Sequence, residues 1–281
     1  MLPFLYPLLL ALLEPPPDAT DHIVATDRPD FANSSLTVPR GGWQLEFGMN
    51  AGLLRVARHP LPLGIPTTLR VGITNRFELR LFDSETAEWI SPFNNVEPRE
   101  SFGGKLRLVD DDPERWRPAV ALQPLFLVGL RRDVKPAAEL TLIVSQPFGH
   151  RVMLDTNFGL EYEIGSPVSL AWEGLIAGSL SVQLHPRAVA YTELYVTGTP
   201  YYRPTLRWGG DGGFIFVLTR HVAVDVAARL ERYGHRPAAS VLTGLTALLV
   251  PPCPIARASK RAICRARPAR PEPLPPAELV H

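Results

Sequence analysis

The chain contains very few cysteines, and none of them lies in the part that is expected to fold. Only two cysteines occur among the 281 residues, Cys253 and Cys264, and both lie close to the C-terminus. This placement excludes a disulfide framework or a cysteine-based metal site in residues 1–252. Whether the two cysteines pair with each other stays open, and such a bond would tie only the tail to itself.

An excess of charge is also lacking. The 29 basic and 28 acidic side chains leave a net charge of +1, which argues against a dedicated nucleic-acid-binding protein. After residue 13 there is no apolar run of about 18 residues, so no membrane-spanning helix is expected beyond the N-terminal leader.

Catalytic and metal-binding motifs are missing as well. The seven histidines show no paired-ligand spacing, and no Gly-x-Ser-x-Gly elbow or phosphate-binding glycine loop occurs. The run Gly209–Gly213 lies within a predicted strand pair, where glycine would allow a kink or close packing at a barrel corner. We therefore predict no enzymatic activity, no cofactor and no metal.

Turn-forming and aromatic residues are plentiful. The chain contains 21 Gly and 30 Pro together with 12 Phe, 5 Trp and 7 Tyr, a composition typical of many short strands. Twelve segments alternate between apolar and polar residues: 43–50, 69–73, 77–82, 102–109, 119–128, 139–144, 152–162, 168–184, 188–196, 206–218, 222–229 and 239–250. Merging or splitting one long pair would give ten or fourteen strands.

The length and alternation of these segments predict an all-β fold, an antiparallel up-and-down transmembrane β-barrel of about 12 strands. Residues 152–162 match the roughly 9–11 residues that a tilted strand needs to cross a bilayer. An even strand number closes such a barrel and removes its edges. Trp43, Leu45 and Phe47 would face lipid, while Gln44 and Glu46 would face a wet lumen.

A soluble β-protein, whose apolar face packs inside, is the alternative. Long strands, aromatic residues near strand ends and true charges on the polar faces all favour the barrel. The aromatic residues in question are Trp43, Phe77, Tyr162 and Trp208.

Charged residues on the polar faces are the candidate functional residues of the lumen. They are Glu46, Glu78, Arg80, Lys105, Arg107, Asp155, Glu161, Glu173, Glu193, Asp211, Asp225 and Arg229. These groups could pair across a narrow lumen and close it. Alternatively, they could line a conducting or binding pore and set its selectivity.

The termini differ in composition from the body. Residues 1–19 are predicted to be a signal peptide, with an apolar block followed by a polar break, although no Lys or Arg precedes Arg28; a buried N-terminal strand or helix is the alternative. Residues 20–42 would form a periplasmic N-terminal segment or plug, and residues 43–250 the outer-membrane barrel. The Pro- and Arg-rich residues 251–281 have the composition of a disordered tail, which would contact peptidoglycan or lipid or simply be solvated.

The polar stretch Asp27, Arg28, Pro29 and Asp30 could fold back into the lumen as a short plug, or it could be a plain linker. Both interpretations stay open at this point.

Three blocks, 26–31, 39–46 and 71–80, resemble the bacterial outer-membrane "transporter" family that is also labelled MetA-pathway of phenol degradation. Glu193, Asp211 and Asp225 fit this resemblance more loosely. The resemblance spans residues 26–250. It implies a porin-like barrel in the bacterial outer membrane that passes small compounds, aromatic or hydrophobic ones among them.

The partners implied are outer-membrane lipid, a small-molecule solute and the barrel assembly machinery. A structural barrel with a charge-plugged lumen is the main functional alternative, and an outer-membrane enzyme is a weaker one. The chain departs from the family at its end, because such barrels usually finish on an aromatic residue and this one reads Ala247-Leu248-Leu249-Val250 before the tail.

Overall fold

The computed structural model describes residues 26–27, 31–53, 63–84, 99–130, 132, 134–166, 172–198, 206–233 and 236–249. The predicted leader, Arg28 to Asp30 and the C-terminal tail lie outside these ranges. All regular elements described are strands, and no helix in this part of the chain is long and apolar enough to span a membrane.

The strand bounds are β1 Trp43–Gly52, β2 Leu63–Gly64, β3 Thr67–Gly72, β4 Phe77–Ser84, β5 Arg99–Val109, β6 Ala119–Gly129, β7 Ala137–Phe148, β8 Val152–Glu163, β9 Trp172–His185, β10 Ala188–Gly198, β11 Leu206–Thr219, β12 Val222–Tyr233 and β13 Arg236–Leu249.

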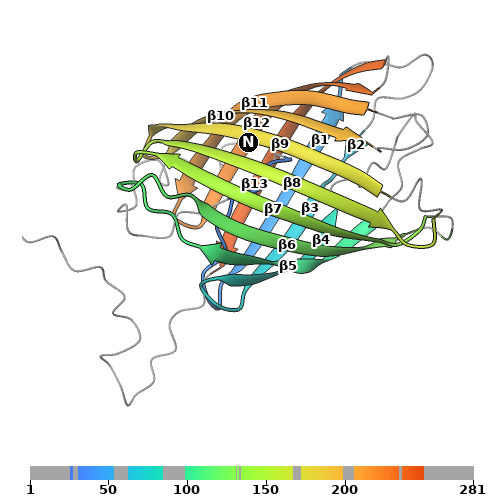
Figure 1. Ribbon diagram of the computed structural model, residues 1–281. Coiled ribbons are helices and arrows are strands. Elements are labelled where there is room, and N and C mark those ends of the chain that lie inside the picture. Colours follow the sequence, from blue (N-terminus) through green and yellow to red (C-terminus); the bar gives the residue numbers. More distant parts are fainter. Residues whose placement is uncertain are drawn as a thin grey trace, which may run out of the picture. The chain divides into compact units, whose positions relative to one another are not determined.

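The strands form one closed antiparallel ring (Figure 1). Each strand pairs with its neighbour in the chain, and β13 pairs with β1 from Trp43↔Leu249 to Gly52↔Ser240. The two-residue β2 only extends the far end of β1, so twelve strands make up the wall. This confirms the predicted barrel and its strand number.

The alternation in each strand is inverted relative to a soluble protein. In β1, Trp43, Leu45 and Phe47 are about half exposed, whereas Gln44 and Glu46 are at most 2% exposed. Large apolar side chains are exposed on the other strands too, and many charged ones are buried. The apolar residues therefore form the outer, lipid-facing surface and the polar residues form the interior, which rules out the soluble alternative.

The two ends of the barrel differ in their connections. Turns of two or three residues join β7 to β8, β9 to β10 and β11 to β12 at one end, where β1 also begins and β13 ends. We call this the short-turn end. Connections such as 85–98 and 199–205 join strands at the other, the long-loop end. In outer-membrane barrels the short turns face the periplasm.

Two local predictions need correction. The sequence pattern puts Phe82 on the polar face of its strand with Glu78 and Arg80, but Phe82 has a φ of 55° and is 52% exposed. The pairing of β3 with β4 shifts register between Thr67 and Leu69, so β4 carries one extra residue as a bulge. This bulge turns the Phe82 side chain to the outer face. The strand predicted at 139–144 is also too short, because β7 continues through the buried Pro147.

The lipid-facing surface yields a first prediction. Leu245 and Leu249 lie on the same outer face of β13, opposite Phe47 and Trp43 of β1 respectively. We expect Leu245→Arg to destabilise the barrel by about 2–4 kcal/mol, and Leu249→Arg at the strand end by roughly 0–1 kcal/mol. Urea unfolding in lipid vesicles measures both, and equal costs would contradict this placement of the membrane.

Candidate functional site

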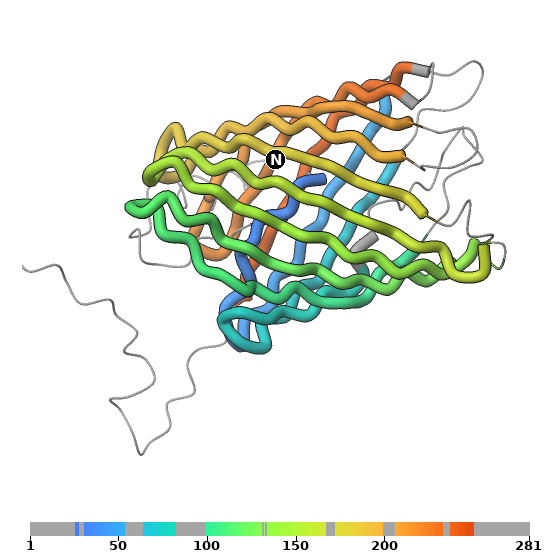
Figure 2. The backbone as a smooth tube through the Cα atoms, viewed as in Figure 1, coloured from blue at the N-terminus to red at the C-terminus, as the bar shows by residue number. Residues whose placement is uncertain are grey.

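The N-terminal segment runs inside the barrel (Figure 2). We call its described part before the first turn, residues 26–27 and 31–38, the luminal segment. A turn at the short-turn end joins it to β1, with Gly42 donating to Pro39 O at 2.8 Å and Gly41 donating to Gly72 O at 2.7 Å. Gly41 has a φ of 76°, a conformation that favours glycine. The chain therefore enters its own lumen just before the wall begins.

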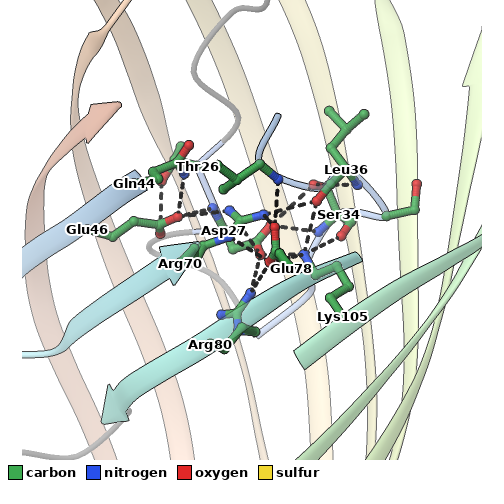
Figure 3. Close-up of polar contacts among 12 residues, drawn as sticks. Thr26, Asp27, Ser34, Leu36, Gln44, Glu46, Arg70, Glu78, Arg80 and Lys105 are labelled. Carbon is green, nitrogen blue, oxygen red and sulfur yellow. Dashed lines mark hydrogen bonds and ion pairs between the residues drawn. The ribbon is translucent and has the colours of Figure 1, made fainter. Parts of the chain in front are cut away.

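The first anchor of the luminal segment is a group of six charged residues that we call the Asp27 cluster (Figure 3). It consists of Asp27 together with Glu46 of β1, Arg70 of β3, Glu78 and Arg80 of β4 and Lys105 of β5. All of the wall residues occupy inward positions of their strands and are at most 3% exposed.

Asp27 is the centre of this cluster. Its Oδ2 lies 3.2 Å from Nη1 of Arg70 and 2.5 Å from Nη1 of Arg80, and it also pairs with Nζ of Lys105. Arg70 extends the cluster to both remaining carboxylates, at 2.9 Å from Glu46 and 2.8 Å from Glu78. A single carboxylate thus joins cations that come from three adjacent strands.

The charges balance only when Asp27 is included. The wall contributes Arg70, Arg80 and Lys105 against Glu46 and Glu78, which is three positive charges against two negative ones. Burial by itself would raise the pKa of Asp27, but Arg70, Lys105 and Arg80 outweigh it and hold that pKa well below its usual value. Asp27 therefore remains ionised and neutralises the excess positive charge of the wall.

Main-chain contacts reinforce this anchor. Val38 N–H donates to Oε2 of Glu78 at 2.7 Å, and Lys105 donates to the carbonyl of Ser34 at 2.8 Å. Both the N–H and the hydroxyl of Ser34 lie 3.2 Å from Oδ1 of Asp27 and donate to it, which closes a loop between residues 27 and 34. The wall thus binds main-chain groups of the luminal segment as well as the charge of Asp27.

The second anchor lies across the lumen, and we call it the Phe31 site. Phe31 N–H and Ala32 N–H donate to the two carboxylate oxygens of Glu193 at 2.9 and 2.7 Å. The Phe31 ring stacks on Tyr195 with centroids 3.9 Å apart. The site also includes Arg207, Asp211, Arg229 and Glu231.

Arginine side chains complete the surroundings of this ring. The guanidinium carbons of Arg207 and Arg229 lie 5.3 and 4.8 Å from the Phe31 centroid, within the range of a cation–π contact. Arg229 pairs with Asp211 at 2.8 Å, and Arg207 pairs with Glu231 at 2.6 Å. Each guanidinium therefore has its own carboxylate partner besides the aromatic ring.

The two anchors face each other across the barrel. From β4, which carries Glu78 and Arg80, to β10, which carries Glu193 and Tyr195, there are six strand steps in either direction round the ring. Between them Ser35 N–H donates to Ser145 of β7 at 2.9 Å. The luminal segment consequently crosses the lumen and binds opposite walls.

Several predicted luminal charges belong to these two groups. Glu46, Glu78, Arg80 and Lys105 join the Asp27 cluster, and Glu193, Asp211 and Arg229 join the Phe31 site. Of the four residues proposed for a plug, Asp27 lies in the lumen, while Arg28, Pro29 and Asp30 lie outside the described residues.

The other five predicted residues lie outside both groups: Arg107, Asp155, Glu161, Glu173 and Asp225. Arg107 pairs with Asp111 at 2.5 Å toward the short-turn end. Glu161 pairs with Arg99 toward the long-loop end, where Glu173 is exposed. Asp155 accepts a hydrogen bond from Ser145, and Asp225 is buried on β12.

Sequence reasoning missed Arg70 of the Asp27 cluster and four residues of the Phe31 site: Phe31, Tyr195, Arg207 and Glu231. Arg70 had a usable signal, because it alternates with Leu69 and Val71 and so shares the inward face of its strand. Tyr195 likewise lies two residues after Glu193. Nothing in the sequence placed the ring of Phe31, since that position depends on contacts made 162 residues along the chain.

No family model and no curated protein matches this chain. Solved structures do match it. An outer-membrane channel from Pseudomonas putida F1 aligns with a TM-score of 0.55 at 8% identity, covering 76% of this chain and 98% of the other. The NanC porin aligns with a TM-score of 0.53 at 9% identity, and the KdgM porin, in complex with disordered oligogalacturonate, with 0.51 at 6% identity. Each of the two porins covers 73% of this chain and 98% of its own. At these identities the likeness establishes the outer-membrane barrel fold.

The charge balance of the Asp27 cluster yields a second prediction. Asp27→Asn would leave an unpaired positive charge in the wall, and losing one partner of a buried ionic group costs about 3–5 kcal/mol. Hydrogen exchange at residues 31–38 should then accelerate by roughly a hundredfold or more. Asp110→Asn is the matched control, because the Asp110–Arg76 pair is exposed and contributes at most about 1 kcal/mol. Unchanged exchange in Asp27→Asn would contradict the role of this carboxylate.

The lowered pKa of Asp27 yields a third prediction. Its contribution to docking is complete above the ordinary pKa of 3.8 and is lost only as the pH falls through the lowered value. Protection factors at Ser34 and Val38, whose N–H groups donate to carboxylates of the Asp27 cluster, should therefore be the same at pH 7 and pH 5. A loss of protection between these two pH values would show that another group controls docking.

Proposed function

We propose that this protein is a porin-like channel of the bacterial outer membrane, and that its luminal segment closes it. The observation that supports this most directly is the closed ring of twelve strands with an ionised interior that is bridged by the chain's own N-terminal residues. Small solutes would cross when the segment leaves the lumen. The fold shared with a solved outer-membrane channel agrees with this proposal.

The wall under the luminal segment favours a solute passage over a purely structural interior. A core built only for stability can use apolar packing, because a buried ion pair is rarely better than well-packed hydrophobic residues. This wall instead buries complete charges, among them Arg70, Lys105 and Glu193, and each of these three contacts the N-terminal luminal segment, which is not part of the wall. Once the segment leaves, those groups face the lumen.

The competing function is a structural barrel that never opens. The full charge balance of the Asp27 cluster favours it, because removing Asp27 from the lumen leaves the wall with one uncompensated positive charge. A solute or counter-ion would have to replace that carboxylate. The two functions therefore differ in whether the luminal segment leaves under native conditions.

Three further parts of the proposal rest on sequence alone. Export through a signal peptide at 1–19, insertion by the barrel assembly machinery and membership of the MetA-pathway transporter family are proposed from the motifs. Outer-membrane lipid would contact the exposed apolar face. Aromatic compounds are the proposed solute class, in agreement with the aromatic contact that the wall makes with Phe31.

A conductance experiment tests the channel. In planar bilayers we expect few openings from the full chain and frequent, larger openings from a variant that lacks residues 20–38, because the segment no longer crosses the lumen. Absence of conductance in both proteins would overturn the proposed function and favour the structural barrel.

A reversible clamp is the matched control. Ser35 N–H bonds Oγ of Ser145 at 2.9 Å, so Ser35→Cys with Ser145→Cys can tie the segment to β7. Cys253 and Cys264 are replaced by serine in this background. Oxidation should abolish the openings and reduction should restore them, whereas openings that persist after complete oxidation would show that ions take another path.

A further inference from the structure

The Phe31 site has the composition of a ligand site that the chain itself fills. An aromatic face, two guanidinium groups and a carboxylate converge on one ring and two adjacent N–H groups. The ring and the N–H groups belong to a segment that is not part of the wall. If that segment leaves, the wall keeps Tyr195 and Glu193 in place on β10, two residues apart on the same inward face.

The charge of the site favours a cation. Counted at their formal charges, Glu193, Asp211 and Glu231 contribute −3, and Arg207 and Arg229 contribute +2, so these five residues sum to −1. Both arginines are already paired, Arg207 with Glu231 and Arg229 with Asp211. Glu193 makes no ion pair of its own among the described residues, and the luminal segment offers it only neutral amides.

An unsatisfied oxygen lies beside Glu193. Asp211 is directly opposite Glu193 in the register of β10 and β11 and is 6% exposed. Its Oδ2 pairs with Arg229, but its Oδ1 is buried and has no hydrogen-bond partner among the described residues. A ligand with more donors than the two amides of Phe31 and Ala32 would satisfy it, and an ammonium group carries three.

The long-loop end of the lumen would attract the same kind of ligand. Glu139, Glu161 and Glu173 are in register on β7, β8 and β9 and share one inward face. Glu163 lies two residues beyond Glu161, and the cations of this region that pair with it are Arg99 and Lys135. Four carboxylates against two cations leave these described residues at −2, which raises the local concentration of cations.

We propose that the Phe31 site binds small aromatic ammonium compounds, with the ring on Tyr195 and the ammonium on Glu193, and that Phe31 keeps the site closed by occupying it. The inference rests on the proposed function in one respect, because a ligand reaches the site only when the luminal segment moves. It names the solute class of the channel and assigns the selectivity to β10.

Binding of 2-phenylethylamine to the full chain and to Phe31→Ala, both folded in detergent, tests this proposal. We expect the variant to bind the amine about tenfold more tightly than the wild type, because the competing ring is gone. In the variant the amine should also bind about tenfold more tightly than its neutral isostere 2-phenylethanol, and more tightly than phenylacetate, since hydrogen bonds between charged groups are the stronger ones.

Two further variants localise the site. Glu193→Gln in the Phe31→Ala background should remove the preference for the amine over the alcohol, and Tyr195→Leu in that background should weaken both ligands. Phe158→Ala is the matched control, because that ring is exposed on the outer face and its loss should leave binding at the wild-type level. Heat-modifiable migration on gels verifies that every variant is folded.

Equal affinity of Phe31→Ala for the amine and the alcohol would overturn the proposal, and so would tighter binding of phenylacetate. The binding measurement does not depend on conductance. Selective binding without conductance in any variant would keep the site and reject the channel, whereas conductance without selective binding would keep the channel and reject the site.

Discussion

The ladder between β1 and β13 is the constraint on which the rest of the structure depends. A strand in lipid has no water to satisfy its backbone, so the first and last strands must bond each other. Their pairing runs along the whole of β1, from Trp43 to Gly52. Closure in turn creates an enclosed interior, and the inward positions of every strand become a surface that has to be hydrated, paired or filled.

The luminal segment fills part of that interior by two different means. At the Asp27 cluster it supplies the one charge that the wall lacks, so the contact is mainly electrostatic. At the Phe31 site it supplies a ring and two amides, so the contact is stacking and hydrogen bonding. The first anchor favours retention of the segment in the lumen. At the second anchor, a small molecule with an aromatic ring and hydrogen-bond donors can replace the groups that the segment supplies.

The barrel could be predicted from the sequence because it is governed by local rules. Alternation with period two, strand length and turn residues are all visible in a stretch such as 152–162, and they led to the correct fold and strand number. The failures were also local. A bulge at Phe82 changes the face on which that residue lies. Strand β7 continues through Pro147, although the sequence pattern ended it at residue 144.

The candidate site was only partly predictable. Inward parity identified Glu46, Glu78 and Lys105 as luminal, but it could not show which of these charges meet. That depends on the closed ring, in which β4 and β10 become opposite walls. The position of Asp27 at the centre of three cations has no counterpart in any periodic pattern, because the described residues of the luminal segment, 26–27 and 31–38, form no strand.

The path of the luminal segment also implies that its two anchors form at different stages of folding. Asp27 meets partners 19 to 78 residues further along the chain, on the first strands of the wall. Phe31 meets Glu193 across 162 residues, on β10, which is separated from β3 by six other strands of the wall. Because loop closure grows more costly with separation, the ionic contacts can form on a half-built sheet while the aromatic ones wait for β10. The segment would then act as an internal gauge of assembly, whose ring finds its place only once the opposite wall has arrived.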